Sequence, residues 1–241
     1  WMLVSQFNES IYRVKNEVDG IQAFQMTYQI IEEAQRYRDY KSVSKLRQVP
    51  ELDEMASKSK KKISIGLDAL ASTEFSFDKN GNLASQVKSL SKAWRSIVVE
   101  DSYQTDIVNQ FNYYNAFVIR VGTLMNTVMQ VSGLSQDSAK DVQLLLSLSK
   151  NSIIKTTDIL GETRAVGTFI LKEGNVSYAM SDSLNALFDK LVAANNAMGP
   201  ALKITLSASA DINQRLSPRV KEIDGAILTV KDFIDEHLIT P

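Results

Sequence analysis

The sequence predicts an all-α protein: elongated, and built as two stacked four-helix bundles that share long helices. Three observations support this prediction. Apolar and small residues recur at the 3–4 spacing of amphipathic helices along most of the chain. No alternating run of β-branched residues indicates a strand. Prolines stand only at positions 50, 200, 218 and 241, so very long stretches have no helix breaker.

The first helix is expected from about residue 3 to 48, just before Pro50. Its apolar series is Phe7, Ile11, Val14, Val18 and Ile21, followed after a slip in phase by Phe24, Tyr28 and Ile31. At ~1.5 Å per residue this helix is roughly 70 Å long, much longer than a usual globular helix.

Three further helices follow in order. The second is expected over about 51–72, and the polar stretch that includes Asp78 and Gly81 predicts a turn after it. The third is expected over about 83–99. The fourth has the most regular apolar stripe, which consists of Ile107, Phe111, Tyr114, Val118, Val121, Met125 and Val128.

Ser132-Gly133-Leu134 interrupts the pattern, and Ser135 is expected to cap a fifth helix over about 136–173. Gly174 is typical of a helix C-terminus. The last helical segment, 177–239, should be kinked or split by Pro200 and Pro218. Because the first and last segments are much longer than the second and third, they fit two bundles placed end to end better than one short bundle.

Composition excludes most kinds of catalysis. The 241 residues contain no Cys, which rules out disulfides, thiolate metal sites and a Cys nucleophile. The only His is His237, and Ile234 stands where a di-iron bundle would need Glu. We therefore expect no enzyme, no cofactor and no metal site. The net charge of −1 gives no general attraction to nucleic acid.

Four residues are candidates for ligand binding. Arg36, Arg38 and Tyr40 lie near the end of the first long helix, where Arg offers a planar fork of donors to a small carboxylate or oxyanion. The alternative is a solvated helix end with favourable cations. Arg164 is flanked by small residues and is expected to face a crowded interior or cavity, where its partner is either a protein carboxylate or an anionic ligand.

A simple length estimate places these residues near one another. If the first and fifth helices start at the same pole, Arg38 lies ~55 Å and Arg164 ~42 Å along its helix. The two arginines then lie within two or three turns of each other.

The order of two motifs resembles a known group. Ser132-Gly133-Leu134 with Asp137, and then Arg164 among small residues, resemble the all-helical sensor regions of methyl-accepting chemotaxis proteins and of some histidine kinases and diguanylate cyclases. The stretch that begins at Gln35 resembles the group's earlier Gln-x-x-Arg-Gly segment, with Asp39 in place of the Gly. The resemblance implies a helical bimodular or nitrate-sensor-like fold, a periplasmic position in an inner-membrane protein, and a homodimer.

With this resemblance, the chain is expected to be a single sensor domain, 1–241, of a chemoreceptor that binds a small anion between helices. The membrane-distal bundle would comprise about 30–115 and part of 165–200, and the membrane-proximal bundle about 1–30, 115–165 and 200–241. The chain lacks a run of ~18 apolar residues and a signal peptide, and it starts at Trp1, so we expect an excised piece whose flanking membrane helices are absent.

Two other functions stay open. The domain could belong to a kinase or cyclase that reads a periplasmic binding protein instead of a free ligand, such as an organic acid, amino acid or inorganic anion. A helical pore-forming toxin is also long, helical and poor in Cys. It needs a concealed apolar hairpin, however, and the apolar runs here are only a few residues long.

Overall fold

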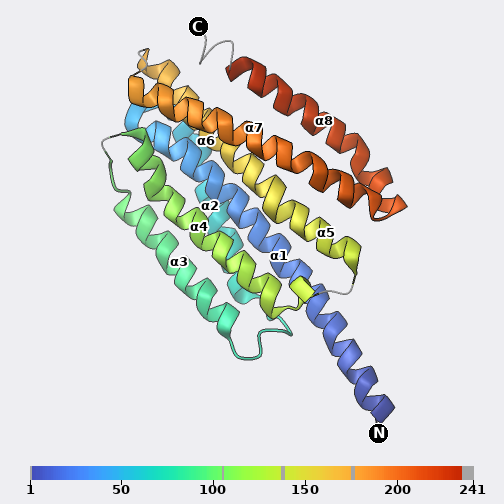
Figure 1. Cartoon of the computed structure of the whole chain (residues 1–241). Coiled ribbons are helices and arrows are strands. Elements are labelled where there is room, and N and C mark those ends of the chain that lie inside the picture. Colours follow the sequence, from blue (N-terminus) through green and yellow to red (C-terminus); the bar gives the residue numbers. More distant parts are fainter. Residues whose placement is uncertain (1, 105, 137–138, 175–176, 235–241) are drawn as a thin grey trace. The chain divides into compact units, whose positions relative to one another are not determined.

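The computed structural model describes residues 2–104, 106–136, 139–174 and 177–234. These residues form helices joined by turns, and they include no strand, so the predicted all-α class is confirmed (Figure 1). Contacts divide the chain into two compact units, 1–138 and 139–241. Each unit is described by itself.

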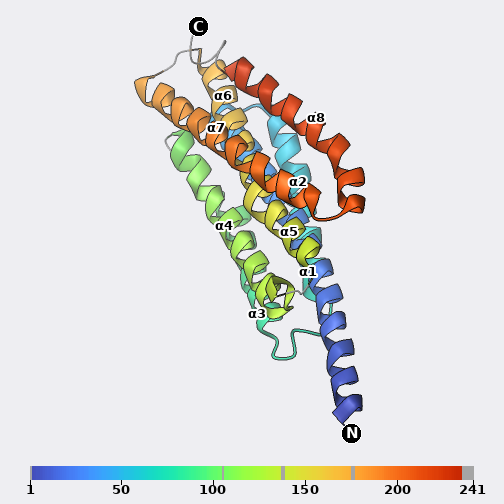
Figure 2. The ribbon, with the colours of Figure 1, turned by 45° about the vertical axis from the view of Figure 1, so that its right-hand side comes forward.

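Unit 1 is a four-helix bundle. Its helices are α1 (Met2–Arg47), α2 (Pro50–Ser72), α3 (Asn82–Glu100) and α4 (Ile107–Val131), followed by the short turn η1 (Leu134–Gln136). Both α1 and α3 pack against α2 and α4, as Figures 1 and 2 show. The turns are short, so successive helices run antiparallel.

The turns of unit 1 follow from local chemistry. Pro50 is the first residue of α2, where its missing N–H costs nothing. Asp78 accepts hydrogen bonds from the N–H groups of Leu83 and Ala84 and so caps α3. Asp106 caps α4 by accepting from the N–H of Asn109. The predicted turn before α3 is therefore confirmed.

The predicted apolar stripes account for most of this core. All seven residues of the α4 stripe are buried. The series of α1 divides into two parts, because Phe24 and Ile31 are buried, whereas Ile11, Val14 and Val18 are at least half exposed. The N-terminal part of α1 is held on one side by the turn at Ser76 and leaves its apolar side exposed.

Unit 2 has three helical segments in the described residues. The first is α5 (Lys140–Leu148), which continues through one π-helical turn (Ser149–Ile153) into α6 (Ile154–Glu173). It is followed by α7 (Tyr178–Ser207) and α8 (Ala210–Ile234). Three apolar clusters lie along α7, centred on Leu184, Leu191 and Met198, and they join it to α5, α6 and α8.

Two predicted helix boundaries in this half are wrong. Ser135 does not cap a helix: it lies in η1, and α5 begins later, at Lys140 after Ala139. The last segment is split at Ala208–Ser209 and not at Pro200, which lies inside α7. Pro200 is exposed, so water can hydrogen-bond to the carbonyl group that the proline leaves free. Gly174 ends α6 with φ of 69°, as predicted.

Stacking of two bundles that share helices, with membrane-distal and membrane-proximal parts, stays a prediction, because each unit is described by itself. None of the helices in the described part of the chain is long and apolar enough to cross a membrane. His237 lies outside the described residues.

Candidate functional site

Arg38, a predicted ligand residue, is fully buried and paired within unit 1. Its guanidinium donates to Asp39 Oδ1 through Nε at 3.0 Å and through a terminal nitrogen at 2.9 Å. The other terminal nitrogen donates to Asn115 Oδ1 at 2.8 Å, and the guanidinium carbon lies 4.0 Å from the ring centre of Phe111. These contacts make Arg38 a structural tie between α1 and α4.

The other predicted residues differ in their surroundings. Arg36 is half exposed and binds Glu32 at 2.6 Å and Glu33 at 2.8 Å on its own helix. Tyr40 is partly buried on α1. Arg164 is exposed on α6, so it does not face a crowded interior, and its part in binding a ligand stays a prediction. Because it belongs to unit 2, its predicted proximity to Arg38 stays a prediction.

A cluster of charged side chains, which we call the polar joint, links all four helices of unit 1. It consists of Lys41 and Lys45 on α1, Asp53 on α2, Asp101 just after α3, and Tyr114 on α4. Lys45 Nζ lies 2.7 Å from Asp101 Oδ2, and the Tyr114 hydroxyl donates to Asp101 Oδ1 at 2.7 Å. Lys41 Nζ lies 2.8 Å from Asp53 and 3.8 Å from Asp101. Lys41 therefore has two carboxylates within reach.

Asp101 is the centre of the polar joint. Burial by itself raises its pKa, but hydrogen bonds from Lys45 and Tyr114, with the charges of both lysines, lower it more, so the pKa lies below its ordinary value. Burial, and then the bond to Asp101, raises the pKa of Tyr114, which keeps the phenol a neutral donor. Asp101 also has a φ of 36°, a conformation that costs free energy for most residues.

An aromatic layer lies next to the polar joint. The ring of Tyr37 on α1 meets Trp94 of α3 edge-on at 5.0 Å and Tyr114 of α4 at 5.5 Å. Trp94 also contacts Phe117 at 4.8 Å, and Tyr113 contacts Tyr114 at 5.0 Å. These ring contacts pack α3 and α4 against α1.

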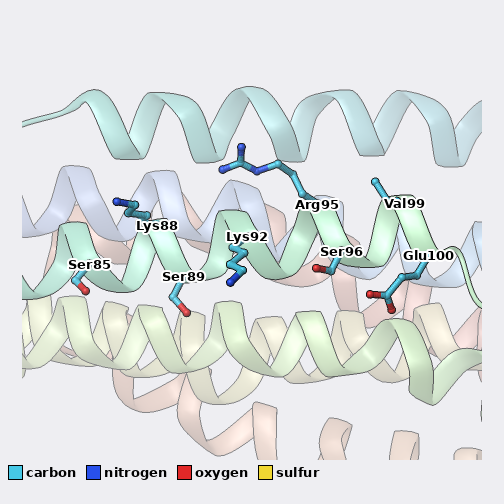
Figure 3. A pocket seen from close by; sticks show the side chains of 8 residues that line it. All are labelled: Ser85, Lys88, Ser89, Lys92, Arg95, Ser96, Val99 and Glu100. Carbon is cyan, nitrogen blue, oxygen red and sulfur yellow. The ribbon is translucent and has the colours of Figure 1, made fainter.

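A groove on the surface of unit 1, between α3 and α4, is a feature that the sequence did not predict. We call it the α3–α4 groove. It comprises two adjoining hollows of about 460 Å³ and 260 Å³, both lined by Ser89 of α3 and Arg120 of α4. A third hollow, of about 730 Å³, lies over the outer face of α3 and shares Lys92 and Ser96 with the larger of these. Figure 3 shows Lys92 and Ser89 extending toward α4, and Arg95 extending the other way.

The charged side chains of α3 and α4 on and beside the groove are mostly positive. Lys88, Lys92 and Arg95 are the only charged residues of α3 before Glu100, and Arg120 is the only charged residue of α4. The excess of positive residues on these two helices was the only sign of the groove in the sequence. Sequence reasoning missed them because each cation alone resembles an ordinary exposed residue, and only the pairing of α3 with α4 brings Arg120 beside Lys92.

In the part of the chain that the structure describes, no group of three or more acidic or His side chains could hold a metal ion. Comparison with protein-family models, with curated proteins and with solved structures finds no match.

Proposed function

We propose that the chain is the sensor domain of a transmembrane signalling receptor, without catalytic activity, and that a bound small anion changes the arrangement of helices in unit 1. The polar joint is the observation that carries the proposal. It places exchangeable ion pairs between α1 and the ends of its neighbours. An apolar core at the same place would instead hold the helices in one arrangement. The sequence resemblance supports the receptor class and an extracytoplasmic location.

The proposed relay uses the length of α1. Lys45 and Asp101 fix the C-terminal end of α1 to the end of α3, and α1 continues as one helix for 46 residues. A change in the position of α3 alters which carboxylate Lys41 binds, and a rigid helix carries that change to its other end. A coupling of about 1–3 kcal/mol is typical of such a link.

Dimerisation through α1 is the second part of the proposal. Ile11, Val14, Val18 and Ile21 have the 3–4–3 spacing of a coiled-coil seam, and they lie opposite the side that holds Ser76. A second copy of the chain would cover this seam. Sedimentation velocity should show that Val14→Asp weakens self-association, whereas Met55→Asp, at an exposed apolar position on α2, leaves it unchanged. A chain that stays monomeric at every concentration contradicts this part.

The first test is thermal. We expect one or more members of a panel of inorganic anions, organic acids and amino acids to raise the melting temperature. A ligand at 100 times its dissociation constant adds about 2.7 kcal/mol, or roughly 5–10 °C for a chain of this size. No shift with any member contradicts direct sensing. A shift that appears only with a periplasmic binding protein would support the indirect sensor instead.

The second test follows the relay by hydrogen exchange. Binding should change the exchange rates of the amides near Lys41 and Lys45. Asp101→Asn should abolish this change while binding persists, because Asn keeps the backbone conformation but removes the charge. Glu54→Gln breaks an exposed pair with Lys58 on α2 and is the matched control. Binding with unchanged exchange along α1 would contradict the relay.

A further inference from the structure

We propose that the α3–α4 groove is the anion site, and that it takes a small anion with two or more negative charges between Lys92 and Arg120. The inference rests on the proposed sensor function for the kind of ligand and adds the place where that ligand binds. The first argument is shape. The hollows of about 460 Å³ and 260 Å³ share Ser89 and Arg120, so side chains from two helices meet over one space of the size that ligands occupy.

The second argument is charge. Within the described residues, no ion pair involves Lys88, Lys92 or Arg120, and Arg95 donates only to the carbonyl of Ser91 on its own helix, at 3.3 Å. Glu100 is the only acidic residue that lines the groove. Lys92 and Arg120 line the larger hollow together and repel each other, so an anion between them removes that repulsion while Arg120 offers a fork of donors.

The position of its cations beside a hollow distinguishes the groove from the other basic surface of unit 1. The second basic stretch of unit 1 is on α2, where Lys58 is paired with Glu54 at 2.6 Å and Lys62 with Glu33 at 2.8 Å. Lys60 and Lys61 of the same stretch form no ion pair among the described residues, but none of these four lysines lines the groove or the hollow beside it. The cations of the groove have no such partners and stand beside Ser89 and Ser96, whose hydroxyl groups are further donors.

The spacing of the cations favours a multivalent anion. Lys92 of α3 and Arg120 of α4 both line the larger hollow, whereas Lys88 and Arg95 line only the hollow over the outer face of α3. Arg120 approaches from the neighbouring helix. A monovalent anion balances the charge of only one of Lys92 and Arg120, whereas a diphosphate or a tricarboxylate has an anionic group for each of them. The chemistry shared by these ligands is two or more anionic oxygen groups on a short scaffold.

The experiment is calorimetric titration of the whole chain with inorganic pyrophosphate and with citrate, at a constant ionic strength near 0.15 M so that screening is equal. Acetate and chloride are the monovalent comparisons. We expect saturable binding of one or both multivalent anions. The double variant Lys92→Gln/Arg120→Gln should weaken it at least about tenfold, the loss that two charge-assisted hydrogen bonds bring. Lys60→Gln/Lys61→Gln changes the net charge equally on α2 and should leave the affinity within about twofold.

The outcomes separate the two proposals. If neither multivalent anion binds, or if the groove variant binds like the α2 control, the groove is not the site. If another ligand still changes exchange along α1 in that case, the sensor proposal stands alone. If pyrophosphate or citrate binds in the groove but exchange along α1 stays the same, the groove assignment holds and the relay fails. Unchanged helical circular dichroism and Trp94 fluorescence in the groove variant will show that it is folded.

Discussion

Replacing Arg38 by Met should destabilise unit 1 far more than the same change at Arg36. Arg38 is fully buried, and its removal leaves Asp39, with 3% of its surface exposed, without the guanidinium that faces it. Asn115 also loses a donor at 2.8 Å. Breaking a buried ion pair by removing one partner costs about 3–5 kcal/mol, so we expect a loss of that size. Met retains most of the side-chain volume, which keeps a cavity from contributing much.

The neighbouring arginine supplies the matched control. Arg36 binds two carboxylates, but 42% of its side chain is exposed. Exposed pairs contribute up to about 1 kcal/mol, so Arg36→Met should cost no more than that. The double variant Arg38→Met/Asp39→Asn should be more stable than Arg38→Met alone, because it also removes the buried carboxylate that has lost the guanidinium.

The assay is urea unfolding followed by fluorescence. Trp94 is buried in unit 1, and Trp1 is the only other tryptophan, so a Trp1→Phe background makes the signal report this unit. The free energy of unfolding is read from the midpoint and the slope. If Arg38→Met costs no more than Arg36→Met, or if the double variant is less stable than the single one, the argument from the buried pair is wrong.

Three further predictions concern stability. The pKa of Asp101 is lower in the folded chain than in the unfolded chain. Its contribution to the free energy of unfolding is therefore complete above the unfolded pKa of about 3.9 and is lost as the pH falls through the lower folded pKa. On acid titration, Asp101→Asn should lose less stability than the parent chain. A Cβ at Gly20 would lie 2.5 Å from Ser132, and a Cβ at Gly66 would lie 2.8 Å from Ile30. Either Gly→Ala change should therefore lower the free energy of unfolding in urea by about 1–3 kcal/mol. Gly122→Ala, whose new Cβ has its nearest contact at 3.7 Å, should be tolerated. Gly174→Ala should lower the stability of unit 2 by about 1 kcal/mol or more, measured by calorimetry, because the φ of 69° is unfavourable for Ala.

Most of the fold could be predicted because its signals are local. The stripe from Ile107 to Val128 marks one face of one helix whatever lies against it, and every member is buried. Boundaries were less predictable where two signals compete. Ser135 is a good helix cap in isolation, but η1 takes that stretch, and α5 begins five residues later. Pro200 was expected to kink or split its helix, but α7 continues through it, and its exposed position lets water complete the hydrogen bonding.

The candidate site was less predictable for a different reason. Arg38 was predicted to bind a ligand, but its partner Asn115 is 77 residues away in the sequence, and that contact gives it a structural place in unit 1. The α3–α4 groove was not predicted from the sequence, because its charged residues look ordinary when each helix is considered alone. The predicted grouping of Arg38 with Arg164 remains untested.

The sequence by itself determined the helical class, the positions of most helices and the absence of thiol chemistry, because periodicity and composition act within one turn or along one chain. Tertiary structure alone decided which charges are neutralised and which are left exposed. The free energy of a charged side chain depends on burial and on the distance to other charges, and helix pairing sets both. For that reason Arg38 became part of the interior, and Lys92 and Arg120 became the two sides of a groove.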